Sequence, residues 1–472
     1  IPVRTPTLWT QASVLEPLTE TLSMLSDDSY AFSFVDLAQR PERQAYFKFD
    51  ETAPKRPRVD YVQLFSGGVD SFAGAAERLA QSDVSLALVS HRSAPQLAKT
   101  QLQLIGALQK KFGKSRVMHI PVWAQLTDRA NKESTHRARS FLFAALAAVV
   151  ARLFEKDACA FYENGVTSLN LPISRQVVGA RATRSTHPVA LKGFGQIFSA
   201  LLGRPFAMKN PYADRTKTEI VEAAVQSGMQ DSIRDTRSCA KVRSATIQYP
   251  HCGVCSQCID RRLAVVAAHA EVHDPEEAYE TDLFLGSRPA GPDRAMALGM
   301  VEIARRMHRE DEDEVFRSFP EITRAVQGSD SSADAAAKNI LDLMRRHGRA
   351  VVTALERGVD THKRALAEGT LPADSLLALL GGGNARQPEI PVIRDDELRL
   401  PQSDVVELVA LKNGKVRIGN ETLSGQQAEV IMLLAGTLRE DQAEQRHLSE
   451  HRTLSAKEIA DAAVTDTSVP AS

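Results

Sequence analysis

The feature that most constrains the fold is an alternation, from residue 59 onward, of short apolar runs with longer amphipathic runs. The short runs predict strands at residues 59–65, 84–90, 116–122, 158–163 and 206–210. The longer runs predict helices at residues 70–81, 94–112, 137–154, 187–202 and 216–227. Parallel strands covered by helices on both faces have this form. The sequence therefore predicts a doubly wound α/β domain.

The chain of 472 residues is longer than one compact core, because single domains usually hold on the order of 100 to 200 residues. Residues 1–55 are expected to form a β-containing appendage, since 30–35 and 44–49 are β-like runs. The other expected parts are the α/β domain at 56–272, a helical region at 273–380, a linker at 381–395, and a small winged-helix-like domain with a disordered tail at 396–472.

The expected last domain has three local signals. Asn413-Gly414 predicts a hairpin turn between two apolar runs. Ser424 with Gln427, and Ser455 with Glu458, have the spacing of capping boxes and predict two helix starts. A hairpin with two helices resembles a winged helix, which suits docking to a partner protein as well as reading DNA.

Charge and hydropathy narrow the functional classes. Lys and Arg total 58 against 59 Asp and Glu, so the chain lacks the positive surplus that dominates nucleic-acid binding. We expect no membrane partner, because no run approaches the roughly 20 apolar residues that cross a bilayer. The beginning of the chain has no signal-peptide pattern, so a cytoplasmic protein is expected. Its first residue, Ile1, indicates an upstream start or the removal of a preceding segment.

The segment SGGVDS at residues 66–71 lies between an apolar strand and an amphipathic helix. Backbone N–H groups at such a helix start favour an anion, and Gly67 and Gly68 let the backbone approach it closely. Ser66 and Ser71 add hydroxyl groups, and Asp70 is a candidate ligand for Mg²⁺. The alternative is an ordinary strand-to-helix turn whose polar residues only cap the helix.

This phosphate loop resembles that of the ATP pyrophosphatases, which cleave ATP to AMP and pyrophosphate while they adenylate a carboxylate or carbonyl oxygen. The segment lacks the lysine of the GxxxxGK[ST] pattern, so transfer of the γ-phosphate is disfavoured. Adenylation makes chemical sense because a carboxylate oxygen is a poor leaving group, whereas AMP departs readily.

Four of the five cysteines lie close together in the sequence, at Cys239, Cys252, Cys255 and Cys258. The spacing C-x12-C-x2-C-x2-C suits a closed tetrahedral zinc site, which is structural because it leaves no position for water. A [4Fe-4S] cluster is the alternative, since tight C-x2-C-x2-C runs also bind iron and sulfur. His251 could replace one cysteine, but four thiols make that unnecessary.

The loop and the cysteines, with PYADRTKTEIV at 211–221 and TRSCAKV…HCGVCSQCIDRR at 236–262, resemble the 7-cyano-7-deazaguanine synthase family, QueC. The resemblance covers residues 59–272. It implies an ATP-pyrophosphatase fold of the adenine nucleotide alpha hydrolase type with a zinc knuckle. It also implies adenylation of 7-carboxy-7-deazaguanine, followed by attack of ammonia to give the amide and then the nitrile.

The resemblance also implies roles for single residues. The expected ATP-binding residues are Ser66, Gly67, Gly68, Val69, Asp70 and Ser71. Lys217 matches a family lysine and is expected to contact phosphate, so Ser66, Asp70, Ser71 and Lys217 are the expected catalytic residues. Cys239, Cys252, Cys255 and Cys258 are the expected zinc ligands. Glu163 follows a strand and either reads a guanine-like base or is a solvated turn residue.

Two features depart from the family. The chain has extra residues at both ends, and residues 165–192 lack the usual DxSGYPDCR-like pattern. Long QueC-like proteins occur in bacterial antiphage operons of the Qat and type IV CBASS kinds, where they are associated with attaching a deazaguanine to a partner protein. A protein N-terminal amine is therefore the expected acceptor. The alternatives are a synthase that uses ammonia and a nucleotide-binding scaffold without turnover.

One further cluster of cations lies before and within the first turns of the predicted helix at 187–202. Its members are Arg175, Arg181, Arg184, His187 and Lys192. Such a cluster could meet a carboxylate or phosphate, since arginine makes bidentate contacts with both. The alternative is a set of solvated side chains.

Overall fold

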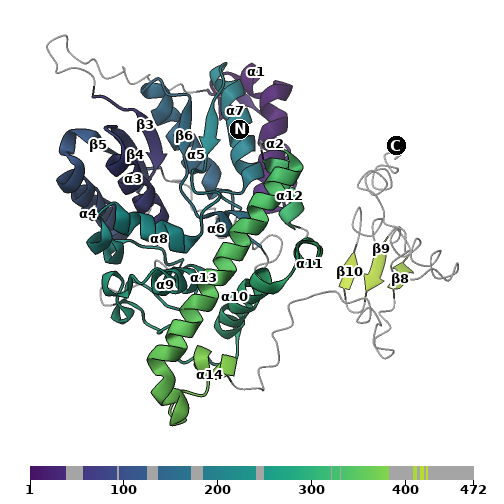
Figure 1. The fold of residues 1–472 in the computed structure, drawn as a ribbon. Coiled ribbons are helices and arrows are strands. Elements are labelled where there is room, and N and C mark those ends of the chain that lie inside the picture. The colour runs from purple at the N-terminus through teal and green to yellow at the C-terminus, as the bar shows by residue number, and fades with distance from the viewer. Residues whose placement is uncertain are drawn as a thin grey trace. The chain divides into compact units, whose positions relative to one another are not determined.

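The fold is known from a computed structural model, which divides into two compact units at residues 1–390 and 391–472. Each unit is described by itself. The described residues are 1–38, 57–92, 95–124, 137–171, 184–240, 249–319, 321–329, 331–381, 408–411, 415–418 and 421–423. The first unit holds the sheet and all the described helices (Figure 1).

The first unit is built on a five-stranded sheet in which every paired strand is parallel to its neighbour. Its strands are β3 (Tyr61–Leu64), β4 (Leu86–His91), β5 (Val117–Val122), β6 (Ala158–Ala160) and β7 (Ala207–Lys209). Each lies within one residue of, or inside, a predicted strand. The predicted α/β class with a parallel sheet is therefore confirmed.

The order of the strands is β5-β4-β3-β6-β7. The chain runs outward from β3 to β4 and β5, then returns to the other side of β3 with β6 and β7. The order therefore reverses between β3 and β6. In open parallel sheets, ligands bind beyond the carboxyl ends of the strands at this reversal.

Each face of the sheet packs against helices, and the apolar side chains of strands and helices form a core there. In β4, Leu86 and Leu88 contribute to one core and Ala87 and Val89 to another, since successive side chains point to opposite faces. The first core contains α3 (Val69–Gln81) and α4 (Pro95–Phe112). The second contains α5 (Arg139–Leu153) and α7 (Pro188–Leu202). A strand covered on both faces has no polar face, which explains the continuous apolar runs.

Two helices after the sheet position the site. They are α8 (Lys217–Gln226), which packs on α3, and α9 (Ser256–Ala267), which packs on α8. The capping box expected at the start of α8 is present, with Thr216 and Glu219 as the reciprocal pair. Short helices also occur along the first unit, both between the strands and after them. They are η1 (Lys114–Arg116), α6 (Gly165–Leu169), η4 (Gln230–Asp235), η5 (Glu271–His273) and η6 (Glu276–Ala278).

The N-terminal part differs from the expectation for residues 30–35. Only β2 (Val35–Asp36) is a strand there, paired with β1 (Pro2–Val3). The dominant elements are the helices α1 (Pro6–Trp9) and α2 (Ala12–Ser26), and α2 packs on α7. Aromatic side chains of the 30–35 run stack on one another instead of pairing in a sheet. The expected strand at 44–49 lies outside the described residues.

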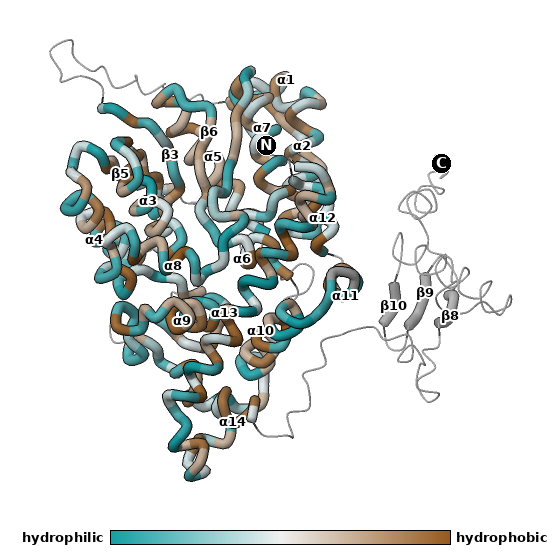
Figure 2. The backbone as a smooth tube through the Cα atoms, in the orientation of Figure 1, coloured by the Kyte–Doolittle hydropathy of each residue, from teal (hydrophilic) through white to brown (hydrophobic). Residues whose placement is uncertain are grey.

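The described residues of 273–381 are mainly helical. Their helices include α10 (Pro292–Arg309), α11 (Glu312–Ser318), α12 (Glu321–Gly328), α13 (Ala333–Ala367) and α14 (Leu376–Gly381). In Figure 1, α10, α14 and most of α13 lie below the sheet domain, whereas α12 packs on α7. Hydrophobic and hydrophilic segments alternate along α13 (Figure 2), as in a helix that buries one face. Because α13 packs against α8, α9 and α10, it joins this region to the sheet domain.

The second unit contains a three-stranded antiparallel sheet, with β9 (Lys415–Ile418) between β8 (Leu408–Leu411) and β10 (Glu421–Leu423). The predicted hairpin runs are thus paired, Leu411 opposite Lys415. The turn at Asn413-Gly414 and the two predicted helix starts lie outside the described residues, as does most of the linker. In the part of the chain that the structure describes, no helix is long and apolar enough to cross a membrane.

Candidate functional site

The phosphate loop, residues 66–71, leads from the carboxyl end of β3 into α3. Gly67 has a φ of 87°, a conformation that favours glycine. The hydroxyl of Ser66 accepts from the N–H of Gly68 at 3.2 Å and lies 3.1 Å from the hydroxyl of Ser71. Val69 is buried in the core, so only its backbone can face a ligand. The loop is therefore shaped before anything binds to it.

Two buried glutamines brace this loop from its own strand and from α4. The amide of Gln63 donates to the carbonyl of Ser71 at 2.7 Å. The amide of Gln101 donates to the carbonyl of Ser66 at 3.2 Å. Because the carbonyl groups of Ser66 and Ser71 already accept from these glutamines, they do not point toward a ligand at the start of α3, where N–H and hydroxyl groups lie.

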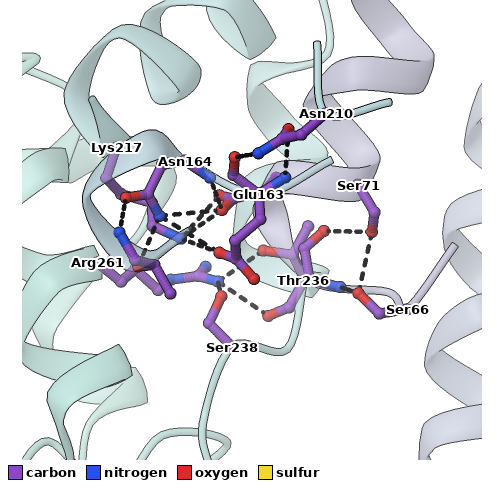
Figure 3. A network of polar contacts seen from close by, with 12 residues as sticks. Ser66, Ser71, Glu163, Asn164, Asn210, Lys217, Thr236, Ser238 and Arg261 are labelled. Atoms are coloured by element: carbon purple, nitrogen blue, oxygen red, sulfur yellow. Dashed lines mark hydrogen bonds and ion pairs between the residues drawn. The ribbon is translucent and has the colours of Figure 1, made fainter. Parts of the chain in front are cut away.

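Asp70 lies in the first turn of α3, and three groups from distant parts of the chain hold its carboxylate. The ammonium of Lys217 donates to both oxygens at 2.8 Å. The backbone and side-chain N–H groups of Asn164 donate to Oδ2 at 3.0 and 3.2 Å. All three residues are at most 5% exposed. Figure 3 shows Lys217, Asn164 and Glu163 converging beside the loop that carries Ser66 and Ser71.

The charges of this pair are fixed by each other. Burial alone would raise the pKa of Asp70, but the charge of Lys217 and the hydrogen bonds to the carboxylate bring that pKa below its ordinary value. Burial would lower the pKa of Lys217, but the charges of Asp70, Glu163 and Asp260 raise it above its ordinary value. Asp70 is consequently an anion and Lys217 a cation at neutral pH.

The pKa of Glu163 is shifted in the direction opposite to that of Asp70. Burial, and then the neighbouring charge of Asp70, hold the pKa of Glu163 well above its ordinary value. Its Oε1 accepts from the side chain of Asn164 at 3.3 Å and lies 3.8 Å from the ammonium of Lys217. The side chain is 29% exposed, so this carboxyl group is where the buried cluster meets solvent.

A third carboxylate adds to the acidic surplus. Asp260, on α9, is 6% exposed, and its Oδ2 has no hydrogen-bond partner among the residues that the structure describes. Burial raises its pKa, which the charge of Lys217 partly offsets. Asp70, Glu163 and Asp260 therefore surround one lysine. Such a surplus of buried acid is costly unless a proton or a cation balances it.

The end of β6 reaches this cluster because Gly165 packs closely on two segments. A Cβ atom at residue 165 would lie 2.0 Å from the carbonyl oxygen of Ala213 and 2.6 Å from the side chain of Leu343 on α13. The N–H of Gly165 donates to the carbonyl of Arg215 at 2.9 Å. The Asn-Gly pair thus brings Asn164 to Asp70, and α13 packs directly behind it.

The four expected metal ligands form a cluster. The sulfur atoms of Cys239, Cys252, Cys255 and Cys258 all lie within 4.8 Å of one another. Hydrogen bonds from the other three thiols, Cys239 first, lower the pKa of Cys252, which favours the thiolate that binds a metal. Among the described residues, no other group of three or more His, Cys, Asp or Glu side chains has this metal-binding geometry.

The helix that begins at the cysteines also carries a second buried ion pair. Arg261 on α9 is 0% exposed, and its guanidinium donates to both oxygens of Asp274 at 2.7 and 3.1 Å. It also donates to the carbonyl of Ile233 at 2.7 Å, and to the hydroxyl and carbonyl of Thr236 at 2.6 and 3.2 Å. Tyr279 donates its hydroxyl to Asp274 at 2.6 Å.

Sequence reasoning found the loop, the cysteines, Glu163 and Lys217, and the structure brings the loop, Glu163 and Lys217 together. It expected Lys217 to contact phosphate, whereas the lysine contacts Asp70. It missed Asp260, Arg261 and Asp274. The signal that could have found the first two is their place on α9, two and three residues after Cys258 and so next to the cysteine cluster.

The cationic cluster is not part of this site in the described residues. Arg184 pairs with Asp27 at 2.5 Å and donates to the carbonyl of Met24 at 2.7 Å. His187 is 3% exposed and caps α7 by accepting from the N–H of Val189. Lys192 is exposed. Arg175 and Arg181 lie outside the described residues.

A cleft of about 280 Å³ opens where the sheet domain meets the helical region. Its charged lining comes from Glu219 and Glu222 on α8 and from Arg346 and Arg349 on α13. Arg346 pairs with Glu219, the capping residue of α8, and donates to the carbonyl of Asp214 at 2.7 Å. The helical region is therefore tied to the helix that carries Lys217.

The chain matches no family model, and no curated protein matches it in sequence. The chemistry proposed for this site consequently depends on the residues and contacts described above.

Proposed function

We propose that this protein is an ATP-dependent ligase that adenylates 7-carboxy-7-deazaguanine and passes it to an amine, with release of AMP and pyrophosphate. The observation that carries the proposal is the phosphate loop beside the buried Asp70–Lys217 pair, at the point where the strand order reverses. The carboxylate substrate and the deazaguanine ring come from the resemblance of residues 59–272 to the QueC family.

The loop supports the binding of a polyphosphate. It presents the start of a 13-residue helix, where N–H groups and the helix dipole favour negative charge. The N-cap, Gly68, has no side chain that could occupy those N–H groups. The hydroxyls of Ser66 and Ser71 add donors at the same edge. These groups would hold phosphate oxygens of ATP and stabilise pyrophosphate as it leaves.

Asp70 would hold Mg²⁺, which would neutralise phosphate charge when bound. Two features of this chain fit that role. The carboxylate is ionised, and Asn164 fixes its direction. Lys217 keeps a positive charge beside the loop, which favours a phosphate there as well as the Asp70 anion.

Glu163 would contact the base. It is the member of the cluster that reaches solvent, and its raised pKa favours the protonated form of the carboxyl group. An uncharged carboxyl group retains a carbonyl oxygen that can accept from a ring N–H of a guanine-like base. It also avoids placing another anion next to the substrate carboxylate.

The cysteine cluster would hold zinc. A tetrahedral ion with Zn–S distances of about 2.3 Å places its sulfur atoms about 3.8 Å apart. The sulfur atoms of Cys252 and Cys258 are 3.9 Å apart. Thiolates that each bind a different iron of a [4Fe-4S] cluster would lie farther apart. A four-sulfur site leaves no position for water, so the metal would be structural.

The acceptor amine would be a protein N-terminus supplied by a partner, as the resemblance to long antiphage members of the family implies. The structure supports an added role for residues 273–381 because α13 packs on Gly165 and ties to α8. Ammonia is the competing acceptor. The two candidates differ in source. Ammonia would come from free ammonium ions, whereas the N-terminal amine would belong to a polypeptide that residues 273–381 help to place.

The test is turnover with ATP, Mg²⁺ and 7-carboxy-7-deazaguanine, with AMP and the base followed by mass spectrometry. The wild-type chain should form AMP, and Asp70→Asn should lower the rate at least about 100-fold, the effect of losing a group that stabilises developing charge. Asp83→Asn is the control because its side chain is 86% exposed. Equal rates for wild type and Asp70→Asn would contradict the proposal.

The acceptor is resolved by adding ammonium or the N-terminal peptide of the operon partner to the same reaction. Consumption of the adenylate by the peptide alone supports protein conjugation. Formation of the amide or nitrile with ammonium alone places the chain with the synthases. Absence of AMP in every reaction, with ATP bound, would indicate a scaffold.

A further inference from the structure

We infer that Arg261 couples the cysteine cluster to the phosphate loop, so that metal binding at the cysteines orders the loop. The inference rests on the proposed function only in that the loop binds ATP. Arg261 is a positioning residue, because none of its contacts reaches the loop directly. It acts through the segment of residues 233–239.

The first step joins the metal site to Arg261. Cys255 is the N-cap of α9, and Cys258 lies in its first turn. Arg261 follows Cys258 by one helical turn, so its place along the helix depends on where the cysteines hold the helix start. On the other side, Asp274 receives two hydrogen bonds from the guanidinium and fixes its plane.

The second step joins Arg261 to the segment before Cys239. The guanidinium donates to Ile233, to both oxygens of Thr236, and at 3.4 Å to the hydroxyl of Ser238. Figure 3 shows Arg261 directed at Thr236 and Ser238. With the two oxygens of Asp274, these make six acceptor atoms for the five N–H donors of the arginine, so each of its three nitrogen atoms has a partner within the protein. Thr236 is itself 0% exposed.

The third step joins that segment to the phosphate loop. The N–H of Arg237, the residue after Thr236, donates to the carbonyl of Gly67 at 2.8 Å. A Cβ atom on Gly68 would lie 3.4 Å from the carbonyl oxygen of Arg237. The loop therefore packs against Arg237. On the N-terminal side of Arg237, Thr236 accepts hydrogen bonds from Arg261, and Cys239 of the cysteine cluster comes two residues after Arg237.

The cysteines and Arg261 hold the same two segments. A metal ion would join Cys239 to Cys258, and Arg261 joins Thr236 to α9. If both are needed to hold Arg237 against Gly67, losing either one frees the loop. By thermodynamic linkage, a metal that favours ATP binding must itself be bound more tightly in the presence of ATP.

The experiment compares Arg261→Lys with Arg262→Lys in the full chain. Lysine cannot reproduce the arginine fork, so Arg261→Lys breaks the grip on residues 233–238. Arg262 lies on the same helix and donates to the backbone of Asp274 instead, which makes its variant a matched control. Thr236→Val is a milder second variant, because it removes only the hydroxyl contact and keeps the shape.

Two quantities are measured with and without chelation of the metal. One is the dissociation constant of ATP with Mg²⁺, and the other is amide hydrogen exchange across residues 66–72. In wild type, chelation should weaken ATP binding about tenfold, a typical coupling between sites, and speed exchange in the loop. Metal-loaded Arg261→Lys should retain a full metal content, yet already show weak binding and fast exchange, and Thr236→Val should fall in between.

Arg262→Lys should match wild type. Unchanged loop exchange in both chelated wild type and metal-loaded Arg261→Lys would overturn the inference. If Arg261→Lys fails to fold, the test depends on Thr236→Val. Metal-loaded Thr236→Val that binds ATP as tightly as wild type and shows equally slow amide exchange across residues 66–72 would contradict the coupling. If ATP does not bind to wild type while loop exchange still follows the metal, the proposed function fails and the coupling stands.

Discussion

Among the described residues, two buried ion pairs near the loop at 66–71 differ in how many of their polar groups have partners. Around Arg261 and Asp274, the guanidinium donates to five acceptor groups, and Asp274 also accepts from the hydroxyl of Tyr279. Around Lys217 and Asp70, one cation faces three carboxyl groups, and Oδ2 of Asp260 has no hydrogen-bond partner within the described part of the chain. The first region is complete within the protein, whereas the second keeps an acidic surplus.

The difference separates structure from chemistry. An ion pair whose polar groups all have partners holds the surrounding segments in place, because movement of one segment would break several hydrogen bonds at once. The acidic surplus around Lys217 offers a place for a cation or a proton that the protein does not itself supply. We therefore expect the Arg261 region to position the loop at residues 66–71, and the Lys217 region to bind the ligand.

The largest effect should come from Asp274→Ala. This change leaves the buried Arg261 without its carboxylate, and removing one member of a buried pair typically costs about 3–5 kcal/mol. Denaturant unfolding measures the loss. Replacing both residues, as Arg261→Met with Asp274→Leu, should recover much of it, because no buried charge remains unpaired. A single variant as stable as wild type would show that the pair is not the anchor we describe.

Lys217→Met should lower the free energy of unfolding by about 3 kcal/mol, for the same reason. Here, however, the loss should depend on solution conditions. Mg²⁺ should restore part of the stability by balancing the charge of Asp70, and it should restore none in Asp274→Ala. Unfolding with and without Mg²⁺ measures this contrast, with the exposed Lys209→Met as control. Identical Mg²⁺ responses in both variants would remove the distinction between the two regions.

A third buried group, His187, lies outside both regions and contributes its own pH dependence. Burial, and then the charges of Arg324 and Arg184, lower the pKa of His187 from 6.5 to about 4. Its contribution to stability is therefore present above pH 6.5 and is lost as the pH falls toward 4. The loss amounts to about 3 kcal/mol.

His187→Asn sharpens the comparison, because asparagine also accepts at a helix N-cap but does not titrate. Its free energy of unfolding should fall less than that of wild type between pH 7 and pH 4, which chemical denaturation at several pH values measures. Parallel pH curves for the two proteins would mean that His187 titrates normally in the folded chain.

The smallest effect should come from Glu163→Gln. The pKa of Glu163 is raised in the folded chain, so its protonated form contributes stability at low pH that is lost as the pH rises through the folded pKa. Glutamine removes that loss, and the variant should gain on wild type as the pH rises from 5 to 8. The gain should be small, since the side chain is partly exposed. A stability difference between variant and wild type that stays constant over this range would mean that Glu163 is already ionised at pH 5.

Local patterns in the sequence were sufficient for much of the fold. The five strands of the sheet and its main helices follow from periodicity, because each pattern reports burial of its own element. The run at residues 30–35 misled for the same reason. Its alternating aromatic residues indicate one buried face, but they do not say whether a strand is available to pair with it. The tertiary structure uses them to pack stacked rings instead.

The sequence by itself determined the loop at residues 66–71, the grouping of the four cysteines and the strand that leads into the site, since each depends on residues close together in the chain. Only the tertiary structure decided what surrounds Asp70. Lys217 is 147 residues away from Asp70, and Asn164 is 94 residues away. Charges at such separations shift one another's pKa only once folding has removed the water between them, and no local pattern records that.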